Sequence, residues 1–383
     1  MNPIYASLPT TIFERMSARA RETGAINLGQ GFPDARGPED VLHAAADALL
    51  NQSNQYPSML GTAELRQAVA AHYRHHQALD LDWTSEVVVT SGATEALAAA
   101  IFGLVTPGDE VLLIQPLYDA YLPLVERAGG TAKFVDLKLP HWRVDMNALE
   151  AAISARTRLL ILNNPVNPSA SMWSHDNLAA LAEICVRHDI VAICDEVWEH
   201  VVFENKHIPL MAMPGMRDRT VKIGSAGKIF AVTGWKVGWM LAAPKLASVL
   251  AKAHQFLTFT TPPNLQAAVA QGLAKGDDWF QEMRQAFALQ RSRLDNGLQQ
   301  AGYVTLPSHA TWFLSIDLPG SGVKLDDESF AVKMLEDGGV ASIPMSAFYA
   351  RDPLRSIVRL CFTKHADTID RAIERFAEMR KSF

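Results

Sequence analysis

The stretch VVVTSGATEAL, residues 87–97, joins a run of β-branched residues to an alanine-rich helix through a turn of small residues. The run 87–90 is apolar without alternation, which is typical of a strand covered on both faces. Small residues in the turn let backbone N–H groups approach an anion, and the following helix directs its N-terminus at the same point. The stretch fits a phosphate site and, equally, an ordinary strand-to-helix turn, because a short glycine turn alone is a weak signal.

The same alternation of short apolar runs and amphipathic segments continues along the chain. Further strands are predicted at 111–114, 133–137, 159–163, 190–195, 221–225 and 238–243. Helical segments lie between them, and the one at 174–188 begins with Ser174 and Asp176 as capping candidates. This order predicts an α/β fold with a mostly parallel sheet and helices on both of its faces.

The pattern changes after about residue 274. A long helical stretch at 279–301 precedes strand candidates at 311–318 and 356–362 and a closing helix at 366–380. We therefore expect a large domain at 36–274 and a smaller α+β domain at 275–383. The N-terminal arm, 1–35, is expected to join the smaller domain.

Composition excludes several classes of protein. Hydrophobic residues make up 49% and charged residues 20% of the 383, a globular balance. The net charge of −6 argues against nucleic-acid binding and against a polybasic membrane contact. The longest apolar stretch, 96–105, is too short to span a bilayer, and the N-terminus has no export-signal pattern. Three cysteines without CxxC spacing fit a reduced compartment, so we expect a cytoplasmic protein.

Polar residues follow other predicted strands at the edge where sheets of this kind bind ligands. Asn164 and Asn167 each precede a proline, which holds them extended in a loop. Asp195 closes an apolar strand, and it either pairs with a cation or donor or caps the next segment. A metal site is the weaker interpretation, because no zinc-like ligand spacing is present among Asp195, Glu196, Glu199 and His200.

Lys228 follows a strand and a glycine-flanked turn beside Ser225, which suits a Schiff-base lysine. The segment also spells S-x-x-K, but the KTG partner motif of the penicillin-recognising enzymes is absent. A Walker motif fails because its first glycine would fall on Lys222.

Arg359 lies in a predicted alternating strand, on the same face as Ile357 and Cys361. A cation on an apolar face either forms a structural ion pair or binds a substrate carboxylate.

Taken in order, these motifs resemble those of the fold-type I, pyridoxal 5′-phosphate-dependent aminotransferases of class I/II, over nearly the whole chain. The resemblance is greatest to the branch with methionine aminotransferase and kynurenine–oxoglutarate transaminase. The segments that carry it are INLGQGFPD (26–34), NQYPSMLGTAELRQAV (54–69), SGATEAL (91–97), TRLLILNNPVNPSA (157–170), TGWKVGW (233–239) and HQFLTFTTPP (254–263). The joint set is specific, whereas any single segment would be weak.

The resemblance implies cofactor roles. Lys228 would form the Schiff base with the cofactor, Asp195 would pair with its protonated pyridine nitrogen, and Asn167 would hydrogen-bond its phenolic oxygen. Tyr118 would stack on the cofactor ring. Tyr56 would reach the phosphate of a partner subunit, which implies a homodimer. The residues expected to hold the phosphate within the chain are Gly92, Ala93, Thr94, Ser225 and Lys236.

Substrate roles follow in the same way. Arg359 would bind the α-carboxylate, helped by the backbone near Gly31 and by Asn167. Phe13 falls where the kynurenine-active relatives place an aromatic that lines the side-chain pocket. Further candidates for this pocket are Tyr56, Tyr118, Trp198, Phe256 and Phe259.

One departure from the family is Trp198, which stands where a tyrosine usually donates to the cofactor's phenolic oxygen. An indole N–H can donate, but it is bulkier and does not ionise, so we expect an altered imine pKa with cofactor binding retained. Lys236 should lower the pKa of the nearby Lys228 by like-charge repulsion.

We therefore expect transamination between a neutral apolar or aromatic L-amino acid and a 2-oxo acid, with methionine favoured, then aromatic amino acids or kynurenine. The alternative on the same cofactor is a carbon–sulfur β-lyase. A nicotinamide-dependent dehydrogenase is disfavoured because Asp34 stands where its third glycine belongs. Intact Lys228 and Asp195 argue against a catalytically silent module.

Overall fold

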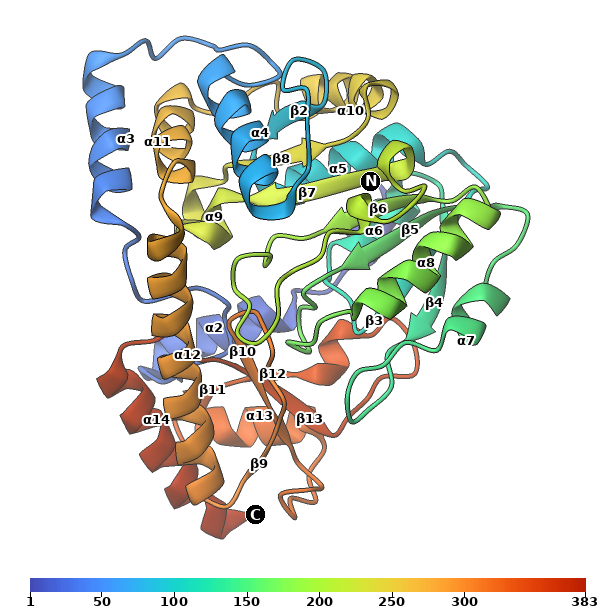
Figure 1. The fold of residues 1–383 in the computed structure, drawn as a ribbon. Helices are drawn as coiled ribbons and strands as arrows, with labels where there is room; N and C mark the ends of the chain where they lie inside the picture. Colours follow the sequence, from blue (N-terminus) through green and yellow to red (C-terminus); the bar gives the residue numbers. More distant parts are fainter.

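A seven-stranded sheet forms the centre of the larger part of the molecule (Figure 1). In the computed structural model, which describes residues 1–383, its strand order is β2-β8-β7-β6-β5-β3-β4, and only β8 runs antiparallel to its neighbours. The mostly parallel sheet predicted from the sequence is confirmed. Its strands are β2 (Val87–Thr90), β3 (Glu110–Gln115), β4 (Thr131–Asp136), β5 (Thr157–Asn163), β6 (Val191–Asp195), β7 (Thr220–Ser225) and β8 (Gly238–Leu241).

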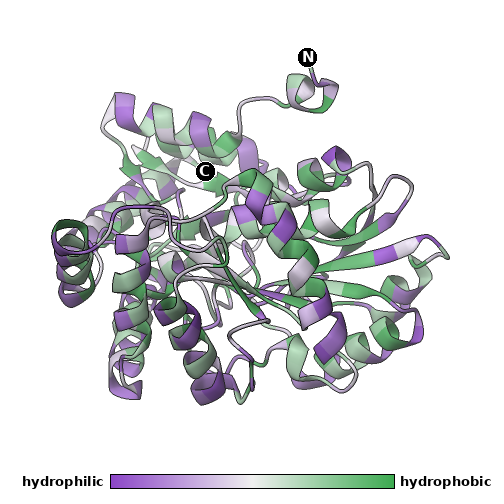
Figure 2. Cartoon of the chain, turned by 90° about the horizontal axis from the view of Figure 1, so that it is seen from above, coloured by the Kyte–Doolittle hydropathy of each residue, from purple (hydrophilic) through white to green (hydrophobic).

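Both faces of this sheet are covered. Val88 of β2 belongs to one hydrophobic core, whereas its neighbours Val87 and Val89 belong to another on the opposite face. Figure 2 shows the result, since the strands are mostly green while the outer helices carry purple residues. The helices of this part are α3 (Glu39–Asn51), α4 (Ala63–Gln77), α5 (Gly92–Leu104), α6 (Tyr121–Arg127), α7 (Met146–Ala151), α8 (His175–Arg187), α9 (Ala226–Ile229), α10 (Pro244–Leu257) and α11 (Pro263–Leu273).

Local capping sets where these helices begin. The Ser174 hydroxyl accepts a hydrogen bond from the N–H of Asn177 and starts α8, as its sequence predicts. The Thr62 hydroxyl does the same for α4 with the N–H of Leu65. At α5, by contrast, no side chain caps the helix, so the first N–H groups remain free for a ligand.

A four-stranded antiparallel sheet, β12-β13-β10-β9, forms the smaller part. The long helix α12 extends from the larger part along this smaller one (Figure 1). The strands are β9 (Val304–Leu306), β10 (Phe313–Asp317), β12 (Ile343–Pro344) and β13 (Ile357–Cys361), and the helices are α12 (Asp277–Gln300), α13 (Asp327–Glu336) and α14 (Ala366–Met379). Short 3₁₀ turns are η1 (Leu210–Ala212), η2 (Arg217–Arg219), η3 (Thr233–Trp235), η4 (Met345–Phe348) and η5 (Arg380–Ser382).

The N-terminal segment lies against the smaller part from its second helix onward, whereas its first helix packs against α6 of the larger part. It holds α1 (Pro3–Ser7), α2 (Ile12–Thr23) and β1 (Ile26–Asn27), and β1 pairs in parallel with β11 (Val340–Ala341). The division at residues 35 and 274 stays our proposal, supported by this pairing. No helix is both long and apolar enough to cross a membrane.

Candidate active site

A cavity of about 210 Å³ lies where β5, β6 and β7 end and α5 begins. The β-sheet order explains the convergence, because these parallel strands present their carboxyl ends at one edge. Residues predicted from separate motifs line this one cavity, namely Gly92, Ala93, Thr94, Tyr118, Asn167, Asp195, Trp198, Ser225, Lys228 and Lys236.

A second cavity adjoins the first and shares Tyr118, Asn167, Trp198 and Lys228 with it. Besides the shared Asn167, it adds the other three residues that the sequence assigns to the substrate, which are Phe13, Gly31 and Arg359. The structure therefore brings the expected cofactor and substrate residues into one continuous site.

The turn between β2 and α5 forms a cradle for an anion. Gly92 has φ +78°, a conformation that glycine adopts without strain. A Cβ on Gly238 would lie 2.9 Å from the carbonyl carbon of Gly92 and 3.0 Å from the nitrogen of Ala93, so only glycine lets β8 approach this turn. A Cβ on Gly92 would lie 3.5 Å from Nζ of Lys236, which places that ammonium beside the free helix N-terminus.

Asp195, at the end of β6, is buried with one oxygen paired and one unpaired. Its Oδ2 accepts a hydrogen bond of 2.6 Å from the hydroxyl of Tyr121, whereas Oδ1 is buried without a partner. Burial raises the pKa of Asp195. The hydrogen bonds from Tyr121 and from the backbone N–H of Val197, together with the charge of Lys228, oppose this rise. A donor with positive charge at Oδ1 would complete the pairing.

Lys228 lies in the short helix α9, and its amine faces two indole rings. Its Nζ is 4.6 Å from the ring centroid of Trp198 and 5.1 Å from that of Trp312. Burial, helped by the nearby cations Arg359 and Lys236 and opposed by Cys361 and Asp195, lowers the pKa of this amine to about 8. The predicted influence of Lys236 is present, but it is smaller than that of burial.

Arg359, on β13, is a buried cation that does not use all of its N–H donors within the chain. Its Nη1 donates to Oδ1 of Asn167 and its Nη2 to the carbonyl of Gly29, both at 2.8 Å, while Nε has no partner. The guanidinium carbon lies 3.9 Å from the ring centroid of Phe313 and 5.5 Å from that of Phe13. Burial lowers the pKa of Arg359 to about 9, so a carboxylate at this point would be strongly favoured.

Asn167 connects the two cavities. Its backbone N–H donates to Oδ1 of Asn163 at 2.7 Å, and its side-chain oxygen accepts from Arg359. Asn163 in turn donates to the carbonyl of Asp195 at 2.9 Å. The loop after β5 thus holds Asn167 at a fixed place between Asp195 and Arg359.

Three predicted aromatic residues lie outside both cavities of this chain. Tyr56 is 81% exposed and Phe256 85% exposed, and Tyr56 packs edge-on against Phe259 at 5.5 Å between ring centroids. The prediction that Phe256 and Phe259 line the pocket is therefore not met within one chain. Tyr56 remains a candidate for contact with a partner subunit.

The acidic residues after β6 form an ion network. Lys222 of β7 donates to Glu196 and, at 2.6 Å, to Glu199, and all three side chains are fully buried. Burial by itself would raise the pKa of Glu196, but Lys222 and His207 lower it to about 2. An ammonium thus lies between the carboxylates that a metal site would use.

Sequence reasoning missed several residues of the site. Tyr121 follows Tyr118 by three positions and begins α6, and its nearness to Tyr118 in the chain was the only signal for it. Asp119 and Phe313 line the second cavity, and neither belongs to a motif that the sequence analysis used.

These residues fit the cofactor that the sequence implies. The unpaired Oδ1 of Asp195 matches a protonated ring nitrogen, and the α5 cradle with Lys236 matches a phosphate. Lys228, with a depressed pKa, matches an amine that must be neutral to react with an aldehyde.

Nearly the whole chain is similar to known aminotransferases. The family described as "Aminotransferase class I and II" matches residues 23–376. A probable N-succinyldiaminopimelate aminotransferase of Mycobacterium tuberculosis is 44% identical over 381 residues, 96% of each chain. Methionine aminotransferase of Escherichia coli is 39% identical over 373 residues, 97% of this chain and 96% of the relative.

Solved structures agree with these relatives. The structure of N-succinyldiaminopimelate aminotransferase from Mycobacterium tuberculosis superposes with a TM-score of 0.96 at 43% identity, over 99% of this chain and all of the other. YbdL of Escherichia coli, described as having a methionine aminotransferase function, gives a TM-score of 0.95 at 39% identity, over 99% of each chain.

Proposed function

Because the chain belongs to the class I and II aminotransferases, it is a pyridoxal-phosphate-dependent transaminase, and we propose that its amino donor is a neutral L-amino acid. Methionine is the favoured donor, followed by aromatic amino acids and kynurenine, and a 2-oxo acid is the acceptor. The observation that carries this choice is the charge of the second cavity, where one buried guanidinium faces aromatic rings and one carboxylate.

The side-chain part of that cavity suits an apolar group. Phe13, Phe32, Trp198 and Phe313 provide its aromatic walls. Asp119 is half-buried there, and its carboxylate lines the cavity. Burial raises the pKa of Asp119, and Arg359 opposes that rise. A second negative charge on a substrate would therefore meet repulsion from Asp119, whereas a thioether or an aromatic ring would not.

The cofactor would be held by three groups. Its phosphate would contact the N-terminus of α5 and Lys236, its ring nitrogen would pair with Asp195, and Tyr118 would lie against its ring. When bound, pyridoxal phosphate supplies an aldehyde that exchanges the amino group and a ring that stabilises negative charge at the substrate α-carbon.

Lys228 is the residue placed to move protons. Its pKa of about 8 leaves a useful fraction of the amine neutral near neutral pH, as a general base requires. Trp198 and Trp312 exclude water from one side of this amine. Asp195 would supply the negative charge that keeps the cofactor's ring nitrogen protonated.

Arg359 would fix the substrate by its α-carboxylate. Each of Nη1 and Nη2 uses one hydrogen for Asn167 or Gly29, so one hydrogen on each remains for a carboxylate. A bidentate contact of this kind sets the orientation of the α-carbon as well as the affinity.

A second candidate donor is N-succinyldiaminopimelate, which the 44% identical relative is named for. Such a substrate carries further carboxylates, and they would need a cation beyond Arg359. The cavity residues of this chain offer only Lys228 and Lys236 besides it, and both belong to the proposed cofactor site.

A donor panel tests the proposal. The holoenzyme is assayed with pyruvate or 2-oxoglutarate and with L-methionine, L-phenylalanine, L-kynurenine, L-aspartate and N-succinyldiaminopimelate. We expect the highest kcat/KM for methionine or an aromatic amino acid. Preference for N-succinyldiaminopimelate would replace our donor assignment, and release of pyruvate and ammonia from cystathionine without an oxo acid would favour the β-lyase.

We further propose a cytoplasmic homodimer in which Tyr56 reaches the partner's phosphate. Its exposure supports this assembly, as do its contact with the exposed Phe259 and the exposure of Phe256. The three free, buried cysteines fit a reducing compartment. Sedimentation equilibrium measures the assembly directly.

A further inference from the structure

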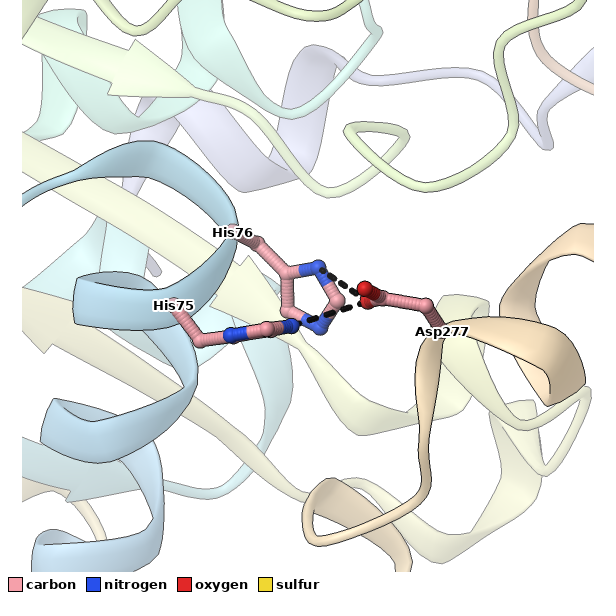
Figure 3. A group of neighbouring side chains, drawn as sticks. All are labelled: His75, His76 and Asp277. Carbon is pink, nitrogen blue, oxygen red and sulfur yellow. Dashed lines mark hydrogen bonds and ion pairs between the residues drawn. The ribbon is translucent and has the colours of Figure 1, made fainter.

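We propose that His75, His76 and Asp277 form a binding site for one divalent transition-metal ion. The two histidines come from the last turn of α4 and the aspartate from the first residue of α12, and both rings point at the carboxylate (Figure 3). This cluster shares no residue with the two cavities of the proposed active site.

The spacing of the donor atoms fits one shared ion. Oδ1 of Asp277 lies 2.9 Å from Nε2 of His75 and 3.7 Å from Nδ1 of His76. Two ligands about 2.1 Å from a common metal ion are separated by about 3.0 Å in octahedral and about 3.4 Å in tetrahedral geometry. The observed separations lie near these values, so small side-chain rotations would suffice.

Accessibility and the position at a helix end also favour a metal. The side chains of His75 and Asp277 are 62% and 69% exposed, which gives an ion a path to the site. The negative end of the α4 dipole adds a favourable potential at the two histidines.

The donor set indicates which metals are suitable. Two imidazole nitrogens and one carboxylate suit Zn²⁺, Ni²⁺, Co²⁺ or Cu²⁺ and do not suit Mg²⁺ or Ca²⁺, which prefer oxygen ligands. The cluster borders a polar hollow lined by Gln281 and Arg284 among others, where water can complete the coordination. Arg284 is the opposing charge, because it lines the same hollow as the three proposed ligands.

Other groups in the chain do not compete well for such an ion. Glu196, Glu199 and His207 form a similar cluster, but Lys222 already lies among its carboxylates. The thiols of Cys185, Cys194 and Cys361 are all buried.

Zinc titration of the tag-free holoenzyme, in competition with a chromogenic chelator, tests the proposal. We expect one equivalent of Zn²⁺ per chain, with affinity falling at least about tenfold in His75→Gln and in Asp277→Asn. The matched control is His175→Gln, which alters an exposed histidine 3.6 Å from Asp176 that has no second histidine, and it should bind as the wild type does. Arg284→Gln should bind more tightly.

Two further measurements identify the ligands of the ion and show whether the variants are folded. X-ray absorption at the zinc edge should report two imidazoles in the wild type, and Zn²⁺ should raise the unfolding temperature of the wild type but not of folded Asp277→Asn. Absence of stoichiometric binding would overturn the proposal. Equal affinity in the folded wild type and the folded His75→Gln/Asp277→Asn double variant would overturn it as well.

Discussion

The hydroxyl of Tyr121 donates to Oδ2 of Asp195 at 2.6 Å, and it leaves Oδ1 of the same buried carboxylate without a partner. The two residues come from α6 and from the end of β6. One oxygen is therefore fixed by the protein, while the other is left to pair with the ring nitrogen of a cofactor in the cavity that Asp195 lines. Tyr121 orients Asp195 and helps to keep it ionised, since its hydrogen bond lowers a pKa that burial raises.

Replacing Tyr121 by phenylalanine should weaken cofactor binding. Loss of a hydrogen bond to a charged group costs about 1.5–3 kcal/mol, or roughly a 10- to 100-fold higher dissociation constant. Without the donor, the pKa of Asp195 should rise further. The measurement is equilibrium dialysis of pyridoxal phosphate across a pH series, and unchanged affinity at every pH would show that Tyr121 plays no such part.

Replacing Arg359 by lysine should raise the KM for every amino acid. A lysine cannot offer the paired donors of the guanidinium, and it loses the stacking on Phe313 at 3.9 Å. We expect a loss of about 1.5–3 kcal/mol in kcat/KM for both methionine and phenylalanine. Cofactor affinity, measured in parallel, should not change. Wild-type kinetics in this variant would mean that another group binds the α-carboxylate.

Replacing Asp119 by asparagine should relax the exclusion of acidic substrates. The change keeps the size of the side chain and removes its charge, so the ratio of kcat/KM for aspartate to that for methionine should rise by roughly fivefold to tenfold. Steady-state kinetics with both donors measure this ratio. A ratio that stays constant would remove Asp119 from the determinants of specificity.

Replacing Lys222 by methionine should strongly destabilise the fold. It leaves Glu196 and Glu199 buried without their cation, which costs about 3–5 kcal/mol in the free energy of unfolding. Lys333→Met is the matched control, because the exposed pair of Lys333 with Asp337 contributes at most about 0.5 kcal/mol. Urea unfolding of both variants at one protein concentration gives the comparison.

The pH dependence of stability follows from the same network. Because the pKa of Glu196 is lowered from 4.5 to about 2, its ionised form stabilises the fold above pH 4.5. That contribution should be lost as the pH falls from 4.5 to about 2, and the difference between wild type and Lys222→Met should shrink with it. A difference that is constant from pH 7 to pH 3 would contradict this assignment.

Local patterns allowed much of the fold to be predicted. The strand predicted at 159–163 is β5, observed at 157–163, and the helix predicted at 279–301 is α12, observed at 277–300, because apolar runs and periodicity are encoded in neighbouring residues. Lys228, Asp195 and Arg359 belong to motifs that a sequence displays directly. The structure places each of them at the expected cavities.

Contacts between elements that are distant in the sequence could not be predicted from such local patterns. The Tyr121–Asp195 hydrogen bond and the placement of Lys222 between Glu196 and Glu199 depend on the order of strands in the sheet. The exposure of Phe256 could not be foreseen either, because an aromatic residue in a helix has the same local pattern whether it faces a core or a subunit interface.

The central claim, that the chain transfers an amino group from methionine, is tested most directly by the absorbance spectrum of the holoenzyme. We predict that L-methionine replaces the band of the aldehyde form of the cofactor with that of its amine form, and that a 2-oxo acid restores the first band. A spectrum that methionine leaves unchanged at saturating concentration, in a protein whose cofactor is bound, would contradict the claim.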